Sequence, residues 1–96
     1  MITKLIHFST EKITATLNER DVIEKLLSVN EFKEIEFRNY DIDSEEAQPL
    51  MIEYRIKGVP STVFIDEKGD FIRKITGMAP EKDYITYLKY DMANGK

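Results

Sequence analysis

The stretch that decides the fold is YRIKGVPSTVFIDEKGD, residues 54–70. In it Val59 and Pro60 stand directly before a β-branched apolar run, STVFID at 61–66, which ends in a charged turn. Such runs, bounded by turn residues, are typical of buried β-strands. The glycine of the turn supplies the positive φ that a tight connection requires. A second apolar run, FIRKIT at 71–76, follows at once, so the sequence predicts an antiparallel hairpin.

Working outward from this hairpin, the sequence predicts an α/β domain. The predicted elements are a strand at 2–9, a helix from the region of Thr10 to about 28–30, a strand at 34–41, a helix at about 47–55, the hairpin strands at 61–66 and 71–76, and a final helix that begins at Pro80. A helical crossover joins the first two strands, so they should be parallel and right-handed. The first strand is apolar at both parities, which is typical of a central strand.

Apolar residues at helical spacing predict the buried faces of the three helices. These stripes are Ile13, Leu17, Val22, Ile23, Leu26 and Leu27 in the first helix, Leu50, Met51, Tyr54 and Ile56 in and after the second, and Tyr84, Ile85, Leu88 and Met92 in the third. Thr10 is the expected N-cap region of the first helix, with Glu11 in its first turn. Residues 93–96 are expected to fray, within a single domain over 1–96.

Composition excludes several classes of function. The 96 residues fit one domain, and no run of about 18 apolar residues is present to span a membrane. A net charge of −4, with basic residues interleaved among acidic ones, argues against a nucleic-acid surface. The N-terminus lacks the pattern of a secretory signal, so we expect a cytoplasmic protein.

Cysteine is absent from the sequence. Its absence removes disulfides, thiol nucleophiles and zinc–thiolate sites in one step. No glycine-rich phosphate loop is present either, and we expect no cofactor and no metal.

The element order, together with the segment from Tyr54 onward, resembles the thioredoxin superfamily. The family signature is a strand preceded by valine or isoleucine and a cis-proline, then a glycine-containing turn and a strand that ends in glycine. Val59, Pro60, Gly69 and Gly77 match it in order and spacing. The resemblance covers roughly residues 4–92. It implies a thioredoxin-like fold, β-α-β-α-β-β-α, with a four-stranded mixed sheet and helices on both faces.

The same resemblance locates the position of the missing cysteines. Phe8 corresponds to the aromatic residue that ends the central strand, and the first cysteine of the family's CxxC follows five residues later. That register reads CxxC as ITAT, from Ile13 to Thr16. Thiol–disulfide exchange needs a thiolate, so the resemblance implies the fold without the redox activity. Because the chain begins at the central strand, it is closer to the minimal glutaredoxin-like core.

By the resemblance, the residue before the cis-proline offers its backbone to an extended partner segment as a short added strand. The implied groove consists of Lys12, Ile13, Thr14, Ala15, Thr16, Val59, Pro60, Gly77 and Met78. Our first hypothesis is therefore a redox-inactive module that binds a protein or an extended peptide. Ile13, in place of a cysteine, would be an apolar contact.

Two alternatives remain. Some thioredoxin-fold enzymes use a hydroxyl at this helix end to activate the thiol of glutathione, and Ser9, Thr10 or Thr14 could supply it. The chain lacks the helical second domain that usually completes such enzymes. Alternatively, the groove is vestigial and the working surface lies elsewhere, for example in a homodimer or around Tyr87 and Tyr90.

His7, the only histidine, falls where thioredoxins carry a buried acid beneath the active site. An imidazole can act as a general base near neutral pH, but no group that would orient it is identifiable. We therefore favour a hydrogen-bonded core histidine.

Four acids gather in DIDSEEAQ: Asp41, Asp43, Glu45 and Glu46. Glu46 stands where a calcium loop needs glycine, so a solvated helix N-terminus explains these acids better.

Overall fold

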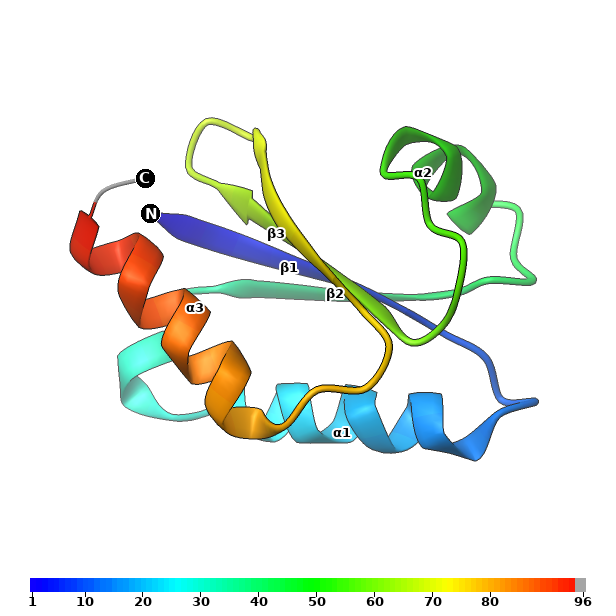
Figure 1. Ribbon diagram of the computed structural model, residues 1–96, viewed down its shortest axis with the longest axis horizontal. Helices are drawn as coiled ribbons and strands as arrows, with labels where there is room; N and C mark the ends of the chain where they lie inside the picture. Colours follow the sequence, from blue (N-terminus) through cyan, green and yellow to red (C-terminus); the bar gives the residue numbers. More distant parts are fainter. Residues whose placement is uncertain (95–96) are drawn as a thin grey trace.

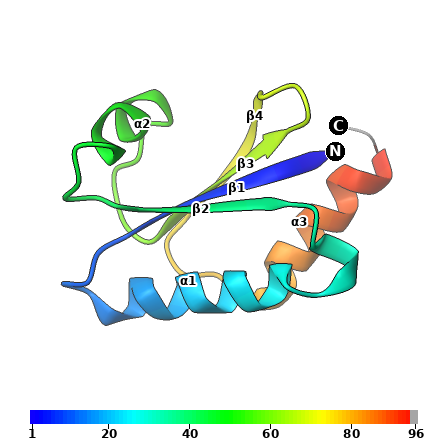
Figure 2. The ribbon, with the colours of Figure 1, turned by 180° about the vertical axis from the view of Figure 1, so that it is seen from behind.

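The structure is a computed structural model that describes the backbone of residues 1–94 and the side chains of residues 1–89. Its elements are β1 (Ile2–Ser9), α1 (Thr14–Leu27), the short 3₁₀ helix η1 (Asn30–Phe32), β2 (Glu36–Asp41), α2 (Ala47–Glu53), β3 (Ser61–Asp66), β4 (Phe71–Thr76) and α3 (Glu81–Asn94). The predicted order of strands and main helices is confirmed. Helices α1 and α3 lie on one face of the sheet and α2 on the other (Figures 1 and 2).

A mixed sheet of four strands, in the order β2-β1-β3-β4, forms the centre of the fold. Strand β1 pairs in parallel with β2, across the α1 crossover, and antiparallel with β3. Strands β3 and β4 form the predicted antiparallel hairpin, and Gly69 in its turn has a φ of +83°. The central position predicted for β1 from its apolar residues is confirmed.

Alternation along the strands divides the core into two clusters on opposite faces of the sheet. The cluster between the sheet and helices α1 and α3 consists of Ile2, Leu5, Ile23, Leu26, Leu27, Phe32, Phe64, Tyr84 and Leu88. On the α2 face are Ile6, Phe8, Ile56, Val63 and Ile65. Adjacent residues such as Val63 and Phe64 therefore support different layers of the fold.

The predicted start of the first helix is wrong. Helix α1 begins at Thr14, and its N-cap residue, Ile13, makes no side-chain capping bond. Thr10 is not a cap. Its hydroxyl instead accepts the Lys12 N–H at 3.3 Å. This local hydrogen bond holds residues 10–12 in a turn, and such bonds compete with helix formation.

The predicted stripe of α1 is also partly wrong. Ile13 and Val22 are exposed, whereas the buried positions are Thr16, Glu19, Ile23, Leu26 and Leu27. The stripe is rotated because two polar residues, Thr16 and Glu19, occupy the interior face.

The ends of the other helices shift by one or two residues. Helix α2 ends at Glu53, because Arg55 adopts a left-handed φ of +55°. Helix α3 begins at Glu81, one residue after Pro80, whose carbonyl accepts the Asp83 N–H at 3.0 Å. The side chains of Tyr90 and Met92, and the last two residues of the segment expected to fray, lie outside the described residues. Within residues 1–94, no helix has the length and apolarity that crossing a membrane would require.

Candidate functional site

The sheet register brings three chain segments together at one edge. Phe8 on β1 lies opposite Ser61 on β3, which in turn lies opposite Thr76 on β4. The segments that follow Phe8, precede Ser61 and follow Thr76 therefore emerge side by side. These are the segments that the sequence placed in the candidate site.

The backbone around Val59 is the distinctive feature of this edge. The Val59-Pro60 peptide bond is cis. The Pro60 carbonyl accepts the Gly77 N–H at 2.7 Å, and Gly77 has a left-handed φ of +91° that favours glycine. Among the described residues, neither the N–H nor the C=O of Val59 makes a hydrogen bond. A donor and an acceptor of the main chain are therefore available beside strand β3.

Two apolar residues of the expected groove, in the segments that follow β1 and β4, are exposed. Ile13 is 48% exposed and Met78 is 58% exposed, while Val59 is half-buried. We call these three residues the Val59 surface. Exposed apolar side chains point to a binding surface where they form one patch, whereas single ones are normal on a folded protein.

The hydroxyls near the start of α1 are mostly committed to local structure. Thr16 is fully buried, and its hydroxyl accepts the Thr10 N–H at 2.9 Å and donates to the Thr10 carbonyl at 2.7 Å. Ser9 and Thr10 are also buried. Thr14 and Ala15 are exposed, so Thr14 is the one candidate hydroxyl of the three that solvent reaches.

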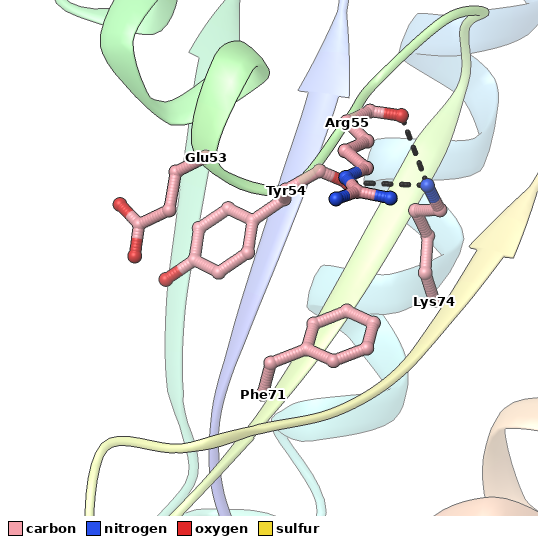
Figure 3. Close-up of a pocket in the computed structure, with 5 residues that line it drawn as sticks. All are labelled: Glu53, Tyr54, Arg55, Phe71 and Lys74. Atoms are coloured by element: carbon pink, nitrogen blue, oxygen red, sulfur yellow. Dashed lines mark hydrogen bonds between the residues drawn. The ribbon is translucent and has the colours of Figure 1, made fainter.

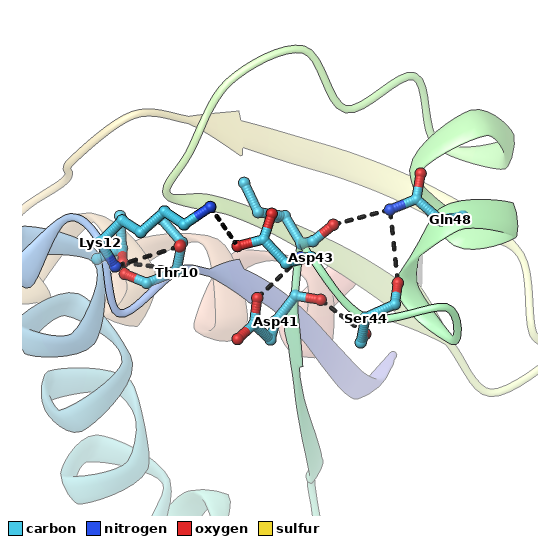
Figure 4. Close-up of polar contacts among 8 residues, drawn as sticks. Thr10, Lys12, Asp41, Asp43, Ser44 and Gln48 are labelled. Carbon is cyan, nitrogen blue, oxygen red and sulfur yellow. Dashed lines mark hydrogen bonds and ion pairs between the residues drawn. The ribbon is translucent and has the colours of Figure 1, made fainter.

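Lys12 turns toward the end of β2 rather than toward Val59. Its ammonium group forms an ion pair with Asp43 at 3.3 Å (Figure 4). Asp41 accepts the Asp43 N–H at 2.8 Å, and the Gln48 amide donates to the Ile42 carbonyl at 2.8 Å. Among residues 1–89, whose side chains the structure describes, no group of three or more His, Asp or Glu side chains is arranged to hold a metal ion. These polar contacts shape the loop between β2 and α2.

His7 is fully buried under this edge, on the sheet face covered by α1. Its Nδ1 lies 2.9 Å from Oδ1 of Asn39, which also accepts the Ser9 hydroxyl at 3.0 Å. Nδ1 therefore carries the proton and donates it, and Nε2 is left with a lone pair. Within the described residues, Nε2 has no hydrogen-bond partner. Burial lowers the pKa of His7, and this outweighs the opposing effects of the Asn39 bond and the Glu19 carboxylate.

A buried carboxylate that we did not predict lies on the same face. Glu19 on α1 accepts the Tyr84 hydroxyl at 2.6 Å and the Ala79 N–H at 3.1 Å. The Tyr84 hydroxyl is also 3.2 Å from that of Thr62. Burial, followed by the bond to Glu19, raises the pKa of Tyr84 above its ordinary range. Glu19 thus fastens the segment beside Met78 to helix α1.

The available signal for Glu19 was its spacing. It lies three residues after Thr16 and four before Ile23, both of which are buried. A search for apolar residues alone misses Glu19, because its partners, Ala79 before α3 and Tyr84 on α3, are 60 and 65 residues away in the sequence.

Comparison with known proteins assigns the chain to a family. The thioredoxin-like domain family matches residues 6–91. The chain belongs to the thioredoxin-like domain family. No curated protein matches it.

Solved structures agree on the fold of this thioredoxin-like protein. Thioredoxin O2 from Arabidopsis thaliana has a TM-score of 0.76 at 16% identity, covering 91% of this chain and 72% of that one. An uncharacterised thioredoxin-like protein from Clostridium perfringens has a TM-score of 0.78 at 21% identity, covering 91% and 68%. Fasciola hepatica thioredoxin has a TM-score of 0.74 at 23% identity, covering 91% and 78%. At these identities the likeness shows the thioredoxin-like fold alone, here without a cysteine.

Proposed function

We propose that this thioredoxin-like protein binds an extended segment of a partner protein at the Val59 surface, without redox chemistry. The observation that carries the proposal is the unbonded N–H and C=O of Val59, which lie beside the buried strand β3. An extended peptide pairs with such groups as an added strand. Its side chains would then reach Ile13 on one side and Met78 on the other.

The energetics favour side-chain contacts as the source of affinity. Two backbone hydrogen bonds contribute about 1–3 kcal/mol net, because each replaces a bond to water. Burying the exposed parts of Ile13 and Met78 contributes a further binding free energy of about 25 cal/mol for each Å² of apolar surface removed from water. Methionine is flexible and adapts to different neighbours, so the surface suits a partner with an apolar residue at its centre.

The position of Ile13 supports a non-covalent role. In the alignment with thioredoxins, Ile13 takes the position of the first cysteine, which is the nucleophile in that family. A branched hydrocarbon cannot attack a disulfide, and no cysteine elsewhere in the sequence can substitute for it. An exposed isoleucine there is a contact residue.

The test is a pull-down from cell lysate with the wild-type protein and with the double variant Ile13→Asp, Met78→Asp. Ile52→Asp is the matched control, because Ile52 is strongly exposed on α2, away from this edge. A protein retained by the wild type and by the control, but lost with the double variant, supports the proposal. Equal retention by the double variant contradicts it.

Glutathione tests the competing enzyme hypothesis in the same preparation. The proposal predicts no thermal shift with millimolar glutathione. A shift that disappears in Thr14→Val would instead support thiol binding through the exposed hydroxyl.

A further inference from the structure

A second candidate site lies on the α2 face of the sheet, where the end of α2 approaches strand β4. It is a pocket of about 480 Å³, a size common for small-molecule sites. Its lining residues are Glu53, Tyr54, Arg55, Phe71 and Lys74. None of them belongs to the Val59 surface, so the two sites can be tested separately.

Aromatic rings form the body of the pocket. The rings of Tyr54 and Phe71 are stacked, with centroids 6.1 Å apart and planes inclined by 24°. Phe71 is 48% exposed, so part of its ring remains available to a third aromatic group. In Figure 3 the Phe71 ring lies below the side chains of Arg55 and Lys74, and the Tyr54 ring lies to their left.

Cationic groups gather at one end of the pocket. The Lys74 ammonium donates to the carbonyls of Tyr54 at 3.1 Å and Arg55 at 2.9 Å, which leaves one of its three N–H groups. The Arg55 guanidinium has no hydrogen-bond or ion-pair partner among the described residues. Figure 3 shows the Glu53 carboxylate near the hydroxyl end of Tyr54, away from these two cations.

The fold does not explain an arginine at position 55. Arg55 has a φ of +55° at the end of α2, where the Ile56 N–H reaches back to the Met51 carbonyl at 2.8 Å. Helices that end this way ordinarily have glycine at this position, because a Cβ is unfavourable in left-handed backbone. The side chain is therefore retained at a conformational disadvantage.

We propose that this pocket binds a small aromatic carboxylate. The ring of the ligand stacks on Phe71 and Tyr54, and its carboxylate accepts hydrogen bonds from Arg55 and from the remaining N–H of Lys74. Two cations against one anion make the pocket locally positive on a chain of net charge −4, which favours an anionic ligand. The guanidinium fork matches a carboxylate in two parallel bonds.

The test is an NMR titration of the ¹⁵N-labelled protein with 2-naphthoate, with neutral 2-naphthamide as the matched control. The proposal predicts chemical-shift changes concentrated at residues 53–55 and 71–74, and an affinity for the amide weaker by at least about 5-fold. Shifts spread elsewhere, or equal affinity for the amide, would overturn it.

Arg55→Gly separates binding from folding. Because glycine suits the left-handed backbone, the variant should keep or raise the midpoint of thermal unfolding. Its affinity for 2-naphthoate should fall by at least about 5-fold, and Arg55→Lys should recover part of the loss. Unchanged affinity in Arg55→Gly contradicts the proposal, whichever way its stability moves.

Discussion

The two faces of the central sheet are built differently. The face under α2 is a continuous apolar cluster around Phe8 and Val63. On the face under α1 and α3, apolar side chains surround polar ones, with His7 and Glu19 completely or almost completely buried. The strands are the same on both faces, so the difference comes from the alternating residues and the helices that cover them.

This difference indicates that the two faces contribute differently to the fold. Buried polar groups contribute less to stability than apolar ones, but their hydrogen bonds require a particular geometry. Those on the α1 face lie directly under the candidate site, and Glu19 holds Ala79, the residue after Met78. We infer that the α1 face combines apolar packing with hydrogen bonds that orient the segment carrying Met78, whereas the α2 face contributes apolar packing alone.

The largest expected effect on stability is a difference between alanine variants of two phenylalanines on opposite faces of the sheet. Phe64 is fully buried between Tyr84 and Tyr87, so Phe64→Ala should lower the free energy of unfolding by about 3–5 kcal/mol. Phe71 is half-exposed, and Phe71→Ala should cost only about 1 kcal/mol. Urea denaturation measures both. Equal losses would contradict the difference in burial between the two rings.

Glu19 tests whether the buried polar groups fix the geometry of the site. Glu19→Ala leaves the Ala79 N–H without its acceptor and the Tyr84 hydroxyl with only the Thr62 hydroxyl as a partner, at a cost of about 2 kcal/mol. Glu19→Gln keeps an acceptor oxygen and should cost about half as much.

The Ala79 amide provides the second readout for Glu19. Its NMR signal should move strongly in the alanine variant and little in the glutamine variant. A loss of stability without a change in this chemical shift would mean that Glu19 stabilises the fold but does not orient the Ala79 segment.

His7 predicts a pH dependence of stability. Burial lowers its pKa in the folded state, so the unfolded chain binds a proton first as the pH falls below about 6.5. Stability should therefore be full well above pH 6.5 and decline as the pH falls below 6.5, by at most about 1.4 kcal/mol per pH unit.

The control for this pH dependence is His7→Gln, which should lack the decline in that window. Asp66 and Glu67, whose pKa values are lowered by hydrogen bonds, act only at lower pH. Parallel slopes for wild type and variant would refute the assignment to His7.

The smallest effect concerns the exposed ion pair between Lys12 and Asp43. Lys12→Met should change the free energy of unfolding by less than about 1 kcal/mol, because water and salt screen such pairs. A larger loss in urea denaturation would show that the loop after β1 contributes more to folding than this account allows.

Local signals in the sequence were sufficient for the sheet and its hairpin. The β-branched run at 61–66 and the glycine at 69 determine a strand and a turn by sterics alone, and the structure contains both. The apolar parity of β1 likewise indicated a strand with neighbours on both sides, as the register confirms.

The features that escaped prediction depend on distant partners. The start of α1 is set by Thr16, whose hydroxyl closes the preceding loop rather than facing solvent. Glu19 is tolerated in the interior only because Tyr84 and Ala79 supply donors. The pocket at Arg55 needs β4 beside α2, a contact between elements that no local pattern encodes.

The most direct test of the account follows the Val59 amide. A peptide selected from a random library on the immobilised protein is added, and hydrogen exchange of the Val59 N–H is measured by NMR. Because this N–H is unbonded in the free protein, the account predicts that exchange slows on binding, with shift changes at Ile13 and Met78. Unchanged exchange at Val59, with peptide-induced shifts elsewhere on the protein, would contradict the pairing of an extended peptide with the Val59 backbone.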